Sequence, residues 1–63
     1  MVFNIKGTTY YVVAFNKNDA VAVCLINKIG IVRDNLIEVD IQVDDEAMGK
    51  VFRSYEGLLK HEV

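Results

Sequence analysis

The lack of cross-linking side chains is what most constrains the fold of this chain. Its 63 residues include one cysteine, Cys24, and one histidine, His61. A single cysteine rules out an internal disulfide, and the usual structural zinc sites need four Cys and His ligands. A domain of this size buries only about 60% of the surface that its unfolded chain exposes. The fold must therefore be held by apolar packing alone or by association with a second chain.

The N-terminal third predicts a β-hairpin. Residues 2–6 and 9–15 are rich in aromatic and β-branched side chains, and Gly7-Thr8 between them fits a two-residue type II′ turn. This turn places Asn4 opposite Tyr11 and Phe3 opposite Val12. One face of the hairpin then carries the side chains expected in the core: Phe3, Ile5, Tyr10, Val12 and Ala14. The other face is mixed: Val2, Asn4, Lys6, Thr9, Tyr11, Val13 and Phe15.

Residues 16–30 fit either a helix or a strand. Nearly every position from Ala20 to Ile26 is apolar, so periodicity does not separate a buried helix from a buried strand. The ends favour a helix, with Asn16 as N-cap and Gly30 at the left-handed position after the last turn. Ile31 would then be the hydrophobic residue that closes the helix end. A strand here would instead give a small, mostly-β barrel with a C-terminal helix.

The remaining chain predicts one strand and one helix. In residues 36–43 a half-buried strand is predicted, because apolar and polar side chains alternate: Ile37, Val39, Ile41 and Val43 on one side, and Glu38, Asp40 and Gln42 on the other. Residues 47–59 carry apolar side chains at helical spacing, after an acidic start at residues 44–46 and before Lys60. We therefore predict a single α+β domain over residues 1–63, of order ββαβα. Its three-stranded sheet would carry both helices on one face and leave the other face open.

Charge and hydropathy narrow the function classes. The net charge is −2, and the seven Lys and Arg residues are scattered, so nucleic-acid binding is disfavoured. The longest apolar run, residues 20–26, is far shorter than the ~20 residues that cross a bilayer. We see no export signal at the N-terminus, and one unpaired thiol suits a reducing compartment. The expected location is the cytoplasm, with no membrane association.

No set of side chains predicts catalysis. Cys24 lies among apolar residues and is expected in the core, while His61 is expected to be solvated near the C-terminus. The four glycines stand apart, so no phosphate-binding loop forms. Six of the nine acidic residues lie between Asp34 and Glu46, but their spacing does not match a calcium-binding loop. We expect no enzymatic activity, no cofactor and no metal.

The open sheet face is the predicted functional surface. Exposed apolar groups with polar neighbours mark interaction sites, and aromatic residues are favoured there. The residues expected to bind a protein partner are Tyr11, Val13, Phe15, Glu38 and Asp40. The partner would be a second copy, giving a homodimer, or a host protein, since small size without a catalytic set is typical of phage and mobile-element accessory proteins. The alternative is an acidic mimic of nucleic acid that uses residues 34–46 to block a basic groove.

Overall fold

The computed structural model describes residues 1–31 and 33–61 and contains a four-stranded sheet and two α-helices. Two short 3₁₀ turns, η1 (Arg33–Asn35) and η2 (Asp45–Ala47), lie in the connections. The strands and helices are β1 (Val2–Ile5), β2 (Tyr11–Val13), α1 (Lys17–Ile26), β3 (Leu36–Val39), β4 (Val51–Phe52) and α2 (Tyr55–Lys60). The predicted α+β class is confirmed. The barrel alternative is wrong, because the run from Ala20 to Ile26 is helical.

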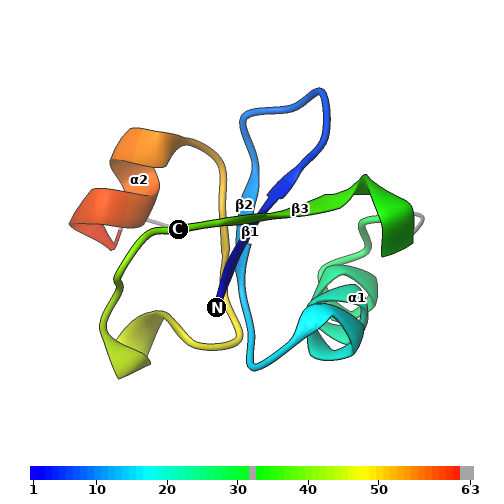
Figure 1. Ribbon diagram of the computed structural model, residues 1–63, viewed down its shortest axis with the longest axis horizontal. Helices are drawn as coiled ribbons and strands as arrows, with labels where there is room; N and C mark the ends of the chain where they lie inside the picture. The colour runs from blue at the N-terminus through cyan, green and yellow to red at the C-terminus, as the bar shows by residue number, and fades with distance from the viewer. Residues whose placement is uncertain (32, 62–63) are drawn as a thin grey trace.

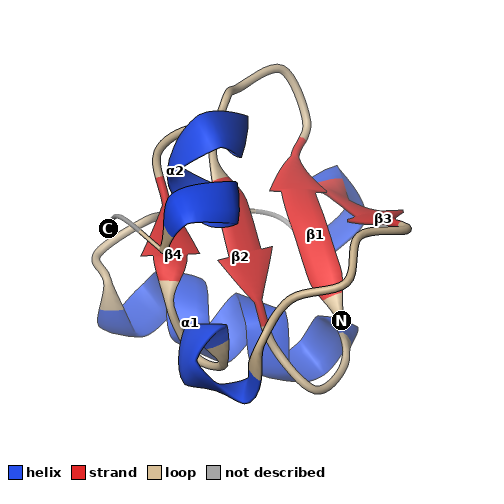
Figure 2. Cartoon of the chain, turned by 90° about the vertical axis from the view of Figure 1, so that its left-hand side faces the viewer, coloured by secondary structure: helices blue, strands red, loops and turns tan. Residues whose placement is uncertain are grey.

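The sheet is antiparallel and its strand order is β3-β1-β2-β4. It has one strand more than predicted, because β4 adds to the edge of β2. Helix α1 lies on one face of the sheet, and α2 lies on the other face with η2 beside it (Figure 1). Figure 2 shows the same three layers with α2 in front of the strands and α1 behind them. The expectation that both helices share one face is therefore wrong.

The β1–β2 hairpin has the predicted register but a different turn. Asn4 pairs with Tyr11 and Phe3 pairs with Val12, as expected. The Thr8 N–H donates to the Ile5 carbonyl at 3.0 Å, so Gly7, with φ 79°, is the third residue of the turn and not its second. The Thr8 hydroxyl also donates to the Ile5 carbonyl, and the Asn4 amide donates to two loop carbonyls. These side-chain bonds hold a longer loop without changing the strand register.

Helix α1 begins where the sequence predicts and ends earlier. The Asn16 side chain accepts a hydrogen bond from the Asp19 N–H at 2.8 Å, which confirms the N-cap. The left-handed residue at the other end is Lys28, with φ 61°, and not Gly30. The Ile29 N–H donates to the Cys24 carbonyl at 2.8 Å, which completes a Schellman motif. Ile29 packs against the core, and this contact offsets the about 1–2 kcal/mol that a left-handed Lys costs.

The predicted C-terminal helix is interrupted at Gly49. This glycine has φ 79°, and its N–H donates to the Val13 carbonyl at 2.8 Å. The chain then runs extended as β4, which places Val51 and Phe52 in the two separate core clusters on either side of the sheet. A helix resumes only at α2, where the Ser54 hydroxyl accepts from the Gly57 N–H at 2.9 Å. Backbone pairing with β2 therefore replaces the first half of the predicted helix.

Both faces of the sheet are buried, by two separate apolar clusters. The first lies between the sheet and α1; its buried members are Phe3, Ile5, Val12, Ala14, Ala20, Val23, Cys24, Leu36 and Val51. The second lies between the sheet and α2; its buried members are Val2, Val13, Ala47, Phe52 and Leu58. Of the hairpin residues predicted for the core, Tyr10 alone is exposed. The predicted strand over residues 36–43 ends at Val39, and the chain then crosses the second face toward β4.

We expect Gly49→Ala to destabilise the chain and Gly30→Ala to leave it unharmed. A Cβ at either position would meet no atom within 4 Å, so the two substitutions differ in backbone conformation alone. Gly49 has a positive φ and should lose about 1–2 kcal/mol, whereas Gly30 does not and should gain about 0.4–1 kcal/mol. Urea denaturation monitored by circular dichroism measures both changes. A stable Gly49→Ala variant would contradict the break at Gly49.

Candidate functional site

The five residues predicted to bind a partner do not form one surface. Val13 is fully buried, and Tyr11 is half-buried with its ring centroid 6.0 Å from that of Tyr55. Phe15, Glu38 and Asp40 are exposed. Glu38 pairs with Phe3, on the α1 side of the sheet, while Tyr11 and Val13 lie on the opposite face. The predicted open sheet face is therefore wrong, although partner binding by the three exposed residues stays a prediction.

Two later segments cover the face that was expected to be open. The chain between β3 and β4 contributes Ile41, Val43 and Met48, which pack against the cluster that contains Val2 and Val13. Helix α2 contributes Leu58, which is fully buried in the same cluster. Helix α2 can cover this face because it lies on the side of the sheet opposite to α1. The break in the predicted helix at Gly49 permits this placement.

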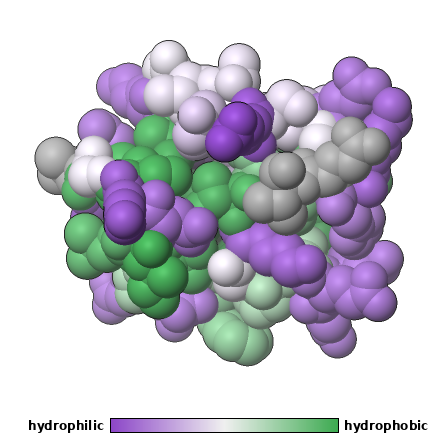
Figure 3. All heavy atoms as spheres, turned by 180° about the vertical axis from the view of Figure 1, so that it is seen from behind, coloured by the Kyte–Doolittle hydropathy of each residue, from purple (hydrophilic) through white to green (hydrophobic). Residues whose placement is uncertain are grey.

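The outer surface of α1 is apolar and uncovered. Asn18, Ala22, Leu25 and Ile26 follow helical spacing along one side, and all four are exposed. We name these residues the α1 stripe. Leu25 and Ile26 are 63% and 80% exposed, and covering each would stabilise an assembly by about 1–2 kcal/mol. Figure 3 shows apolar atoms gathered on the side of the molecule where α1 lies.

The α1 stripe was not identified from the sequence, although the signal was present. A surface helix normally has polar side chains on the side that faces water. In α1 the inward positions Ala20, Val23 and Cys24 are apolar, and so are three of the four residues of the α1 stripe. An uninterrupted apolar run predicts a segment that is buried on every side. In this chain it indicates instead a helix with two apolar sides, one of which faces the sheet.

A hollow of about 250 Å³ lies at the C-terminal end of α1. It is lined by Tyr10, Asn27, Ile29, Val51 and Arg53. Ile29, in the loop after α1, and Val51, in β4, give the hollow apolar walls. The other three side chains add polar atoms. It lies just beyond the last turn of α1, between the loop that follows this helix and the sheet.

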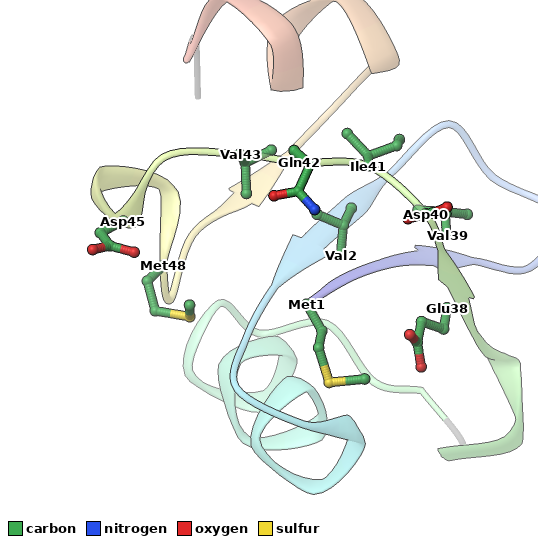
Figure 4. A pocket seen from close by; sticks show the side chains of 10 residues that line it. All are labelled: Met1, Val2, Glu38, Val39, Asp40, Ile41, Gln42, Val43, Asp45 and Met48. Atoms are coloured by element: carbon green, nitrogen blue, oxygen red, sulfur yellow. The ribbon is translucent and has the colours of Figure 1, made fainter.

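The acidic segment lies along a second, larger hollow of about 350 Å³. Figure 4 shows that its walls come from the N-terminus, from β3 with the chain that follows it, and from η2. The carboxylates among its lining residues are Glu38, Asp40 and Asp45. All six acidic residues between Asp34 and Glu46 are exposed. Asp44 lies 3.5 Å from the His61 imidazole, which ties the end of α2 to this segment.

Cys24 and His61 occupy separate environments. Cys24 is a free cysteine, fully buried in the cluster under α1, and burial raises the pKa of its thiol above the ordinary value of 9.0. His61 is exposed at the end of α2, where it faces Asp44. A nucleophilic cysteine needs a lowered pKa and an adjacent base. Cys24 has the opposite shift, so its role is that of a core side chain.

Within residues 1–31 and 33–61, no three Cys, His, Asp or Glu side chains gather closely enough to hold a metal ion. Neither helix of that part of the chain has the length and hydropathy needed to cross a membrane. Comparison with protein-family models, with curated proteins and with solved structures finds no match to this chain.

We expect the stability of the chain to fall above about pH 9 because of Cys24. The unfolded thiol ionises first, so the folded state is favoured below the ordinary pKa and loses that advantage as the pH rises toward the raised folded pKa. The slope is at most about 1.4 kcal/mol per pH unit. Urea denaturation from about pH 7 to about pH 10 measures it. The Cys24→Ala variant should show a shallower decline, and equal slopes would contradict a buried thiol.

Proposed function

We propose that this chain is a small, non-catalytic protein-interaction module that binds its partner through the α1 stripe. The observation that carries the proposal is the exposure of Leu25 and Ile26 on a helix whose other side is already packed on the sheet. A contiguous exposed apolar patch with polar neighbours is a mark of an interaction site. The partner that fits is a protein with a neutral, apolar surface.

The non-catalytic part of the proposal is supported by the placement of the reactive groups. The thiol of Cys24 is buried under α1, and His61 lies at the end of α2 on the other face of the sheet, so the two groups do not meet (Figure 1). A reduced thiol also suits the cytoplasm. The proposed role is compatible with an accessory protein of a phage or another mobile element, which would act by binding a host protein or a copy of itself.

The test replaces one exposed residue of the α1 stripe. Ile26→Lys should leave folding intact, because Ile26 is 80% exposed and surface changes rarely exceed about 0.5 kcal/mol. It should weaken partner binding at least about tenfold, since a charge would be buried in an apolar contact. Wild type and Ile26→Lys each serve as bait for affinity capture from the source cells. Calorimetry on the purified partner then measures the loss of affinity.

Leu59→Lys is the matched control, because Leu59 is 53% exposed on α2, in the opposite layer of the molecule. Binding should survive this change. If every captured protein binds wild type and Ile26→Lys equally, the α1 stripe is not the binding surface.

A second candidate function is supported by the acidic segment. Its six carboxylates are all exposed, and no Lys or Arg lies in the sequence between Asp34 and Lys50. Such a surface suits a basic groove that otherwise holds nucleic acid. Within residues 1–31 and 33–61, one contact of this segment lies within ion-pair distance, that of Asp44 with His61, so most of its charge faces water.

The acidic surface predicts binding that depends steeply on salt. Binding to a basic nucleic-acid-binding protein should fall at least about tenfold between about 50 and 500 mM salt, because screening weakens exposed charge pairs. The double variant Glu38→Lys/Asp40→Lys should abolish it, whereas Glu56→Lys on α2 should not. Titration calorimetry at several salt concentrations measures both effects. Salt-independent binding would exclude the nucleic-acid mimic.

A further inference from the structure

We infer that an extended, basic segment of a partner protein adds to the free edge of β3 as an antiparallel fifth strand of the sheet. This inference goes beyond the proposed function, because the edge contains no residue of the α1 stripe. It is carried by three features of β3: its outward backbone groups, its exposed side chains and the charge around it.

Strand β3 forms one edge of the sheet. The order β3-β1-β2-β4 leaves one side of β3 without a neighbouring strand among residues 1–31 and 33–61. Strand β3 lies in front of β1 in Figure 1 and at the right-hand margin of the sheet in Figure 2. The other edge strand, β4, has two residues, whereas β3 has four. The edge of β3 is therefore the longer place for another strand to pair.

The pairing with β1 determines which backbone groups of β3 point outward. The Lys6 N–H donates to the Asn35 carbonyl at 2.7 Å, so Asn35 faces β1. Successive residues of an antiparallel strand face opposite sides, which directs Ile37 toward β1 as well. The N–H and C=O of Glu38 therefore point away from the sheet. Both groups can bond to one residue of an added strand, as in the recognition of peptides by sheet edges.

The side chains of β3 favour a partner segment with alternating residue types. Glu38 is exposed on the α1 side of the sheet, opposite Phe3. Ile37 shares the α2 side with Val39 and is 45% exposed. On an added strand, the residue beside Glu38 lies on the α1 side, and its two neighbours lie on the side of Ile37. A basic residue between apolar residues matches both sides of β3.

Charge selects a basic segment as the occupant. Glu38 and Asp40 are exposed, and no Lys or Arg of the described residues lies within ion-pair distance of either carboxylate. A Lys or Arg beside Glu38 would form a cross-strand pair of opposite charge, which stabilises a sheet. Lys6 and Arg33 lie toward the other end of β3, where Lys6 bonds to Asn35. The acidic half of the edge is therefore its C-terminal half.

A second copy of the chain suits this edge less well than a basic segment. It would bring a second set of the same carboxylates to the edge, and like charges on paired strands destabilise the pairing. The net charge of −2 on each chain adds to the repulsion. A short segment also does not need the about 800 Å² per partner of a stable dimer, since main-chain hydrogen bonds provide much of its affinity.

A synthetic peptide of about six residues, with Lys and Val in alternation, tests strand addition. We expect it to bind and to shift the amide signals of Glu38 and Asp40 most strongly in nuclear magnetic resonance spectra. A peptide with Glu in place of Lys should bind at least about tenfold more weakly, because it has the wrong charge. A peptide in which all Lys precede all Val should also bind at least about tenfold more weakly, because it lacks the alternation.

Methylation of the peptide backbone separates strand addition from attraction between charges. In an antiparallel pair the Lys beside Glu38 directs its own N–H toward β3. N-methylation of the Lys residues should therefore weaken binding at least about tenfold, whereas N-methylation of the Val residues should not. Both peptides keep the same charge. Equal binding of the two would overturn the inference, because the acidic segment would then act through charge alone.

Substitutions at Glu38 test the edge from the side of the protein. Glu38→Pro removes the outward N–H and no bond to β1, so the sheet should remain folded, which circular dichroism verifies. It should weaken peptide binding at least about tenfold, and Glu38→Gln, which keeps the N–H, should weaken it less. Glu38→Lys should prefer the peptide with Glu. Glu56→Lys on α2 and Ile26→Lys in the α1 stripe are controls that should bind like wild type.

Three outcomes overturn the inference. Wild type that does not bind the alternating peptide at about 1 mM excludes strand addition, and the proposed function survives if a captured partner is lost with Ile26→Lys. Full peptide binding by Glu38→Pro excludes the edge of β3. A wild-type dimer in sedimentation velocity that Glu38→Pro dissolves shows that a second copy occupies the edge. Peptide binding that Ile26→Lys retains supports the edge whether or not the α1 stripe binds a partner.

Discussion

The backbone pairing between β2 and β4 is the interaction on which the rest of the structure depends. Val13 donates to Lys50 at 3.1 Å and accepts from Gly49 at 2.8 Å, and these bonds hold the late chain against the early hairpin. Because β4 occupies that edge, α2 starts on the second face of the sheet. Each face of the sheet then has its own apolar cluster, so the apolar side chains of β2 are covered by other segments of the same chain.

Local chemistry predicted the parts of the fold that local contacts determine. The hairpin register, the Asn16 cap and the helical character of the segment from Ala20 to Ile26 all follow from neighbouring residues. The interruption at Gly49 does not follow from neighbouring residues. The apolar side chains among residues 47–59 have the spacing of one continuous helix, and this spacing gives no sign of a break. Their assignment depends on hydrogen bonds to Val13, 36 residues earlier, which no local pattern contains.

The candidate site shows the same division. The exposure of Phe15, Glu38 and Asp40 follows from the sequence, but these residues do not share one open surface with Val13, because Val13 is buried beneath α2. The α1 stripe was missed because a run of apolar residues does not say which side of a helix is buried. Deciding that requires the position of the sheet, and the sheet is assembled from segments at both ends of the chain.

The strand order has a consequence for synthesis on the ribosome. The two central strands are consecutive, so the hairpin can close as soon as residues 2–13 have emerged, while β3 and β4 join later through pairs such as Val2 with Val39 and Tyr11 with Phe52. Until those later segments are made, Val2 and Val13 remain in water on the nascent chain. The sheet thus grows outward from its middle, and the interval before β4 arrives is when the growing chain is most exposed to chaperones and to aggregation.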